Sequence, residues 1–295
     1  MRICLMIEGQ EGQTWEEWQA LARGCEEHGL EGLFRSDHYG SLLGPRRAAL
    51  DAWATLGALA AQTTRIRLGT LVSPATFRHP SVLARMAATV DHVSGGRVEV
   101  GLGAGWNEEE HWRHGFEFPE LSVRLERFEE QLEIVRRSWS EDEFDFHGRH
   151  YELEGCRALP KPLQQHLIVG GKGKRGTLEP ARRFADEYNA PFVSPEEAQQ
   201  IKTQWDKTLS VMTGCVLGED RARLLERVER VLARMERSDD PEAFVAESRG
   251  SWVIGTLDEA RARIAEYEAA GVERMMLQNL DHSDLDAVAL MALLQ

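Results

Sequence analysis

Eight short, strand-like runs recur along the 295-residue sequence, and each is followed by a stretch with helical periodicity. The clearest helical stretch spaces Leu121, Leu125, Phe128, Leu132, Val135 and Trp139 alternately by four and three residues, so one helix face carries all of them. The expected strands cover residues 2–7, 32–36, 66–72, 97–102, 167–170, 188–192, 210–216 and 274–278. Strands and helices that alternate without a break predict the α/β class and a TIM (β/α)8 barrel.

Two segments exceed a minimal barrel of this kind. Residues 140–165, after the fourth helix, include a polar and aromatic run at 143–151 that predicts a short hairpin. Residues 236–271, after the seventh strand, are expected to add one helix over 257–270. Neither insertion has a pattern that predicts a core of its own, so residues 1–295 are expected to form a single domain.

Charge and cysteine content limit the partners. Lys and Arg total 35 against 49 Asp and Glu, a net charge of −14, and the basic pairs are isolated, so nucleic acid and anionic membranes would be repelled. The longest weakly polar stretch is too short to cross a bilayer. Cys4, Cys25, Cys156 and Cys215 form no C-x-x-C pair, and no secretory signal is recognised. We therefore expect a cytoplasmic protein that acts on a small molecule.

The second strand ends in Asp37 and His38, at the end of a barrel strand where chemistry gathers. A histidine can hydrogen-bond a reacting atom or move a proton near neutral pH, and the adjacent acid can order the loop or contact a ligand. The alternative is a structural histidine that anchors the loop. The position favours His38 as the catalytic residue and Asp37 as a ligand-binding residue.

The fifth strand ends in a glycine-rich, basic loop. Glycines 170, 171, 173 and 176 allow backbone amides to approach a ligand, while Lys172, Lys174 and Arg175 supply positive charge. Thr177 begins a helix, and a helix N-terminus attracts anions. The loop predicts a phosphate site, with Gly170, Gly171, Lys172, Gly173 and Thr177 as its candidate residues. A glycine-rich turn with solvated lysines is the alternative.

The fourth strand leads into Gly103, Ala104, Gly105, Trp106 and Asn107. The third glycine of a dinucleotide fingerprint is missing, so this loop is not a Rossmann motif. We expect Gly105 to bring backbone beside a flat ring and Asn107 to offer an amide to the polar edge of that ring. The following run spaces Glu108, His111 and His114 like half of a di-iron motif, but the second half is absent, and a solvated polar helical turn without metal is expected.

Several motifs in order over nearly the whole chain resemble the bacterial luciferase-like monooxygenase superfamily, and within it the branch of oxidoreductases that depend on coenzyme F420. The matching segments are 29–38, 64–72, 77–80, 91–97, 103–108, 170–171, 184–189, 255–256 and 270–272. The resemblance implies a luciferase-like barrel that binds a flavin-type ring at the strand ends, with the phosphate near the fifth-strand loop and His38 beside the reactive part of the ring.

The resemblance also implies a non-proline cis peptide that ends the third strand and bulges against the back of the ring. Leu71–Val72, following Thr70, is the candidate, and these three residues are expected to line the cofactor site. Some deazaflavin enzymes place a catalytic glutamate just after the fourth-strand glycines, where this chain has Gly105 and Trp106. A homodimer is expected from the family.

Three functions remain open from the sequence. The leading hypothesis is hydride transfer between F420 and a small organic substrate. The second is an FMNH2-dependent monooxygenase of the alkanesulfonate type, in which Arg35, Arg78 or Lys172 could contribute to a sulfonate pocket. The third is a flavin-binding protein without catalysis, against which the intact Asp37–His38 pair argues.

Overall fold

A computed structural model describes residues 1–44, 47–172 and 175–295. Eight parallel strands close into a barrel in the order β1, β2, β3, β4, β7, β8, β9, β11, because β8 pairs with β9 and β11 pairs with β1. The barrel strands are β1 (Arg2–Ile7), β2 (Gly32–Arg35), β3 (Arg67–Pro74), β4 (Val98–Gly103), β7 (His166–Gly170), β8 (Glu187–Pro191), β9 (Thr208–Gly218) and β11 (Arg274–Gln278). The expected TIM barrel is confirmed, and every expected strand is present to within two residues.

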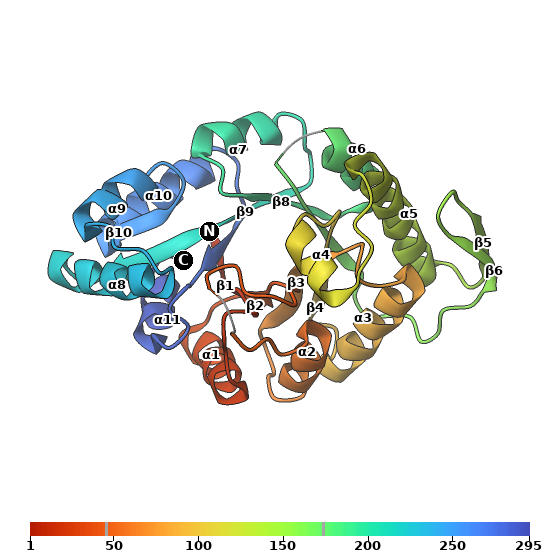
Figure 1. The fold of residues 1–295 in the computed structure, drawn as a ribbon, viewed down its shortest axis with the longest axis horizontal. Helices are drawn as coiled ribbons and strands as arrows, with labels where there is room; N and C mark the ends of the chain where they lie inside the picture. The colour runs from red at the N-terminus through yellow and green to blue at the C-terminus, as the bar shows by residue number, and fades with distance from the viewer. Residues whose placement is uncertain (45–46, 173–174) are drawn as a thin grey trace.

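Helices surround the strands (Figure 1). Those that follow the barrel strands are α1 (Trp15–His28), α2 (Ala52–Ala60), α3 (Pro80–Ser94), α4 (Glu108–His114), α5 (Leu121–Ser140), α6 (Arg175–Phe184), α7 (Pro195–Lys202), α8 (Arg221–Arg234) and α11 (Leu285–Ala292). Local sequence fixes several starts: Thr14 and Ser194 each form a capping box with the glutamate three residues later. Of the helices in the described ranges, none has the length and apolar character needed to span a membrane.

A cluster of apolar side chains fills part of the barrel interior. Cys4, Met6, Phe34, Leu71, Ile168 and Met276 pack there as one cluster. A larger cluster lies between the outer faces of the strands and the helices. Because both strand faces are buried, the strands appear in the sequence as nearly continuous apolar runs, which is why they could be located from sequence.

Strand β3 bulges where the family resemblance implies it. One extra residue of β3 lies between the pairs Thr70–Val100 and Ser73–Leu102, and the Leu71–Val72 peptide is cis, as expected. The side chain of Val72 occupies space left by three glycines. A Cβ on Gly101, Gly103 or Gly170 would lie 3.0, 2.6 and 3.0 Å from a methyl carbon of Val72. These glycines are therefore required by the packing of the bulge itself.

The two insertions differ in how well the sequence describes them. The first forms the expected hairpin, β5 (Phe144–His147) antiparallel to β6 (Glu152–Cys156), which projects beyond α5 (Figure 1). The second contains α9 (Pro241–Ser248), β10 (Val253–Thr256) and α10 (Leu257–Ala269), so the expectation of a single added helix was incomplete.

The second insertion packs against α8 and β9 and shares one hydrophobic cluster with them. Strand β9 has 11 residues; its first part pairs with β11, and its last four residues pair with β10. Val228 of α8, Phe244 of α9 and Ile254 of β10 belong to a separate hydrophobic cluster. The long β9 therefore extends past the barrel and supports a small additional packing layer.

Candidate functional site

The C-terminal ends of β2, β3, β4 and β7 are neighbours around the barrel, since these strands pair in that order. They carry the sequence clusters expected at the site: Asp37–His38, Thr70–Val72, Gly105–Asn107 and, of the fifth-strand cluster, the described residues 170–172 and 175–177. The structure confirms that these clusters share one rim of the barrel.

His38 lies immediately beyond β2 and is held by a carboxylate from α4. Its Nδ1 atom is 2.8 Å from Oε2 of Glu110, and its side chain is 12% exposed. The edge of its ring meets Trp106, with 5.7 Å between the ring centroids. Trp106 itself is 64% exposed, so the histidine lies against a wall of the barrel mouth.

Glu110 is buried, and both of its carboxylate oxygens make hydrogen bonds. Besides His38, it accepts hydrogen bonds from the backbone N–H of Tyr39 and from that of Gly40, the latter at 3.1 Å. Burial lowers the pKa of His38, but the hydrogen bond and negative charge of Glu110 outweigh burial and raise it. Burial likewise raises the pKa of Glu110, and the contact with His38 reverses the direction and lowers it. Each residue thus favours the charged form of the other.

The interpretation of residues 108–114 as a solvated polar turn was wrong for Glu110 and His111. The helix α4 buries Glu110 and His111, while Glu108 and His114 are exposed. Asn107 caps the helix by accepting from the N–H of Glu110 at 3.3 Å. A partial signal was present in the sequence, because Asn107, Glu110 and His111 fall on one helix face at spacings of three and four.

Both ring nitrogens of His111 make hydrogen bonds within the protein. Its Nδ1 donates to the carbonyl of Asn107 at 2.6 Å, and its Nε2 accepts from the hydroxyl of Thr76 at 2.7 Å. Neither nitrogen is available as a metal ligand in this arrangement. The half di-iron spacing seen in the sequence therefore serves to anchor α4 against the loop after β3.

Asp37 is buried, and its carboxylate accepts hydrogen bonds from Arg78 and Ser73. Arg78 donates to both of its oxygens, at 2.5 and 3.1 Å, and Ser73 donates to one at 2.6 Å. These bonds fix the loop between β2 and α2, which is one of the two roles expected for Asp37. A direct cofactor contact stays a prediction.

Arg35 does not reach the mouth. Its side chain is fully buried and donates to the carbonyls of Ser36 and Leu50 at 3.1 and 2.8 Å. Arg78, in turn, is occupied by Asp37 and by Asp51. Of the three basic residues considered for a sulfonate pocket, only Lys172 is exposed to solvent.

A second carboxylate at the mouth was missed by the sequence analysis. Glu8 follows β1, is half-buried, and accepts from the amides of Gln10 and Gln278 at 2.8 and 2.6 Å. Its negative charge also contributes to the raised pKa of His38. No local motif marks Glu8, because Gln278 approaches it from the last barrel strand.

The predicted ring-binding residues lie at two depths. Val72 is half-buried at the surface of the bulge, Leu71 is buried beneath it, and Gly105 has a φ of +82°. Thr70 is fully buried, and its hydroxyl donates to the carbonyl of Gly101 at 3.0 Å. Val72 thus offers the apolar surface, whereas Leu71 packs in the barrel interior and Thr70 supports the barrel wall below. A cofactor contact of Leu71 stays a prediction.

The fifth-strand loop forms a narrow, hydroxyl-lined turn. A Cβ on Gly171 would lie 2.4 Å from Oγ1 of Thr177 and 2.6 Å from Oη of Tyr188, and those hydroxyls are 2.8 Å apart. The helix α6 begins here, and Lys172 is exposed. Gly173, another predicted phosphate ligand, lies outside the described residues. The backbone N–H of Gly171 donates to the carbonyl of Asn189 at 2.9 Å, so a phosphate at this turn would rely on Lys172 and on the N-terminus of α6. The phosphate site stays a prediction.

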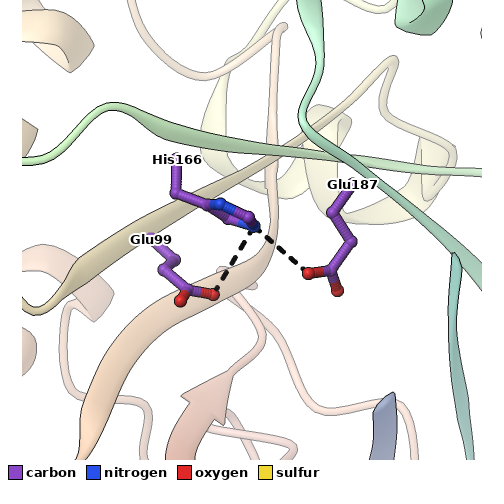
Figure 2. A group of neighbouring side chains, drawn as sticks. All are labelled: Glu99, His166 and Glu187. Atoms are coloured by element: carbon purple, nitrogen blue, oxygen red, sulfur yellow. Dashed lines mark hydrogen bonds and ion pairs between the residues drawn. The ribbon is translucent and has the colours of Figure 1, made fainter. Parts of the chain in front are cut away.

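At the opposite end of the barrel, Glu99, His166 and Glu187 form a cluster with the spacing of metal ligands (Figure 2). Nε2 of His166 lies 3.2 Å from a Glu187 oxygen and 3.9 Å from a Glu99 oxygen. However, the buried guanidinium of Arg274 contacts the same two carboxylates, at 2.9 and 2.7 Å. Arg274 already supplies the cation, so this cluster is a structural ion-pair network.

The chain is similar in sequence to several known proteins. A family model described as luciferase-like monooxygenase matches residues 2–274. The chain is 36% identical over 289 residues to an F420-dependent glucose-6-phosphate dehydrogenase of Amycolatopsis mediterranei, with 88% of this chain and 86% of that protein covered. It is 31% identical to the pyrimidine monooxygenase RutA of Stutzerimonas stutzeri, over 57% of this chain and 49% of that protein. The chain thus spans about half the length of RutA, and likewise 48% of a 39% identical uncharacterized protein of Mycobacterium tuberculosis.

Solved structures support the fold. The monooxygenase RslO1 from Streptomyces bottropensis superposes with a TM-score of 0.83 at 24% identity, covering 99% of this chain and 98% of that one. An F420-dependent secondary alcohol dehydrogenase superposes with a TM-score of 0.79 at 19% identity, covering 99% and 97% of the two chains. At these identities the likeness concerns the fold alone.

Proposed function

The chain belongs to the luciferase-like monooxygenase family, and we propose that it is an oxidoreductase in which coenzyme F420 exchanges a hydride with a small organic substrate. The observation that carries the proposal is the His38–Glu110 pair beside the Leu71–Val72 bulge. Identity of 36% to an F420-dependent dehydrogenase over 88% of the chain supports F420 as the cofactor.

Each part of the rim has a role in this proposal. Leu71 and Val72 would support one face of the cofactor ring, and the turn around Gly171 and Thr177 would hold its phosphate. When bound, F420 supplies the hydride chemistry. His38 would take up or release the accompanying proton at its ring, while the loop held by Asp37 and Arg78 keeps the histidine in place.

An FMNH2-dependent monooxygenase is the second candidate, and the match to RutA favours it. The alkanesulfonate type is disfavoured by the positions of Arg35 and Arg78, which are engaged elsewhere. A flavin-binding protein without catalysis is the third candidate; the raised pKa of His38, caused by Glu110 against the effect of burial, argues for a proton-transfer role instead.

Turnover measurements separate these candidates. The purified protein is mixed without oxygen with F420 and a panel of alcohols that includes secondary alcohols and glucose 6-phosphate, and loss of oxidised F420 is followed by absorbance. We expect reduction with at least one alcohol, and a loss of about 10²- to 10⁴-fold in His38→Ala. Oxygen-dependent turnover with FMNH2 and none with F420 would support the monooxygenase instead. Full turnover by His38→Ala would exclude the proposed role of His38.

A further inference from the structure

The contact between His38 and α4 has a consequence for the chemistry of the imidazole. We propose that Glu110 is a positioning residue that keeps the proton of neutral His38 on Nδ1, so that Nε2 is the atom that exchanges a proton with the substrate. The proposal rests on the proposed function, because it assumes that His38 takes part in proton transfer.

The hydrogen bonds of Glu110 decide the position of the proton. Oε1 accepts from two backbone N–H groups, Tyr39 and Gly40, which can only donate. Oε2 lies 2.8 Å from Nδ1 of His38. An ionised carboxylate can only accept, so Nδ1 must carry a hydrogen, and the Nε2 of a neutral His38 is then an acceptor.

The charges around His38 come from three elements. Glu8 follows β1 and Asp37 follows β2, while Glu110 comes from α4. The charge of Asp37 is balanced by Arg78, and Glu8 is held by two amides. Of these three carboxylates, only that of Glu110 forms a hydrogen bond with the ring within the described residues. Glu110 is therefore the residue whose removal should change both the proton position and the pKa.

The same contact fixes the loop geometrically. By joining the ring of His38 and the N–H groups of the next two residues, Glu110 ties the loop after β2 to the first turn of α4. Asn107 caps that turn through the N–H of Glu110, and His111 anchors it to Thr76. The predicted cofactor residue Asn107 thus acts on the site through α4.

The first test is made on the protein without cofactor. The protein is labelled with ¹⁵N in its histidines, and the two ring nitrogens of His38 are followed by NMR as the pH is varied, with His38→Asn used for assignment. We expect the Nδ1–H tautomer in the wild type. In Glu110→Gln we expect a mixed tautomer and a pKa lower by about 1 to 3 pH units. Glu110→Asp, which keeps the charge, should restore part of the pKa.

Glu109→Gln is the matched control, since Glu109 is the adjacent glutamate, its side chain is 69% exposed, and within the described part of the chain its one ion pair is with Arg113. It should leave both the tautomer and the pKa of His38 unchanged. An Nε2–H tautomer in the wild type, or an unchanged pKa in a folded Glu110→Gln protein, would overturn the proposal, whatever reaction the protein catalyses.

The second test uses F420 reduction with the alcohol that the panel identifies. Glu110→Gln should lower kcat by at least about 10-fold and move the acid limb of the kcat/KM profile to lower pH, with little change in KM. In a His38→Ala background, Glu110→Gln should have no further effect on kcat. An equal loss in both backgrounds would contradict the positioning role. Normal NMR behaviour of the pair with full activity in His38→Ala would instead reject the proposed function alone.

Discussion

Replacement of Arg274 by Met should destabilise the fold strongly without affecting the cofactor site. The Arg274 side chain is fully buried at the N-terminal end of the barrel and contacts Glu99 at 2.7 Å and Glu187 at 2.9 Å. The variant removes the buried cation from two buried carboxylates. His166, and Arg67 at 3.6 Å from Glu99, can satisfy only part of this deficit. Loss of one partner from a buried ion pair costs about 3–5 kcal/mol.

The pKa of Glu187 shows the direction in which Arg274 acts. Burial raises this pKa, but Arg274 and the hydrogen bond from His166 outweigh burial and lower it from 4.5 to about 2. Because the folded-state pKa is depressed, the stability contributed by ionised Glu187 is present above pH 4.5 and is lost as the pH falls toward 2.

Urea unfolding at pH 7 and pH 4.5 tests the prediction. Arg274→Met should lower the free energy of unfolding by about 3–5 kcal/mol at pH 7 and by less at pH 4.5, since a carboxylate freed of Arg274 can then take up a proton. Neutralising the partners as well, with Glu99→Gln and Glu187→Gln, should restore part of the loss. The control Arg157→Met removes an exposed pair with Glu143 and should cost less than about 1 kcal/mol. A loss below about 1 kcal/mol at pH 7 for Arg274→Met would refute the reasoning.

Three further predictions concern the site and the assembly. Gly171→Asp should weaken cofactor binding at least about 10-fold, by both charge and collision with the hydroxyls of Thr177 and Tyr188, as a fluorescence titration can measure; unchanged affinity would place the phosphate elsewhere. Gly103→Ala should lower the free energy of unfolding by about 1–3 kcal/mol, because its methyl would lie 2.6 Å from Val72; an unaltered urea midpoint would contradict this. The homodimer expected from the family is tested by light scattering on the eluted protein, where a monomer mass would reject it.

The barrel could be predicted because its signal is local. Each strand of the barrel is buried on both faces and therefore forms an apolar run that a short window detects. Strand β10 has only four residues, Val253–Thr256, and exists because the end of β9 is free to pair with it. No window around residue 253 contains that information, so the second insertion was described incompletely.

The site was predicted in part for the same reason. Position at a strand end singled out His38 as a candidate, and the family resemblance alone gave the Leu71–Val72 cis peptide. Glu110 lies 72 positions from His38 in the sequence and approaches it only when α4 packs over the loop. A search for a glutamate directly after the fourth-strand glycines finds Gly105 and Trp106, whereas the structure supplies a carboxylate one helical turn later.

The charge cluster opposite the mouth had no sequence signal at all. Glu99, His166, Glu187 and Arg274 lie near the starts of four different strands, β4, β7, β8 and β11. Barrel closure brings them together. In the sequence, each looks like an ordinary polar residue beside a strand. Pairing of Glu187 with Arg274 depends on closure between strands 87 residues apart.

Cofactor choice is the central claim, and a direct binding titration tests it. The purified protein is titrated separately with F420, FMN and, without oxygen, FMNH2, and cofactor fluorescence or absorbance is followed to saturation. We predict saturable binding of F420 with one site per chain, retained in His38→Ala and weakened in Gly171→Asp. Tight binding of FMN or FMNH2 together with no binding of F420 would contradict the account.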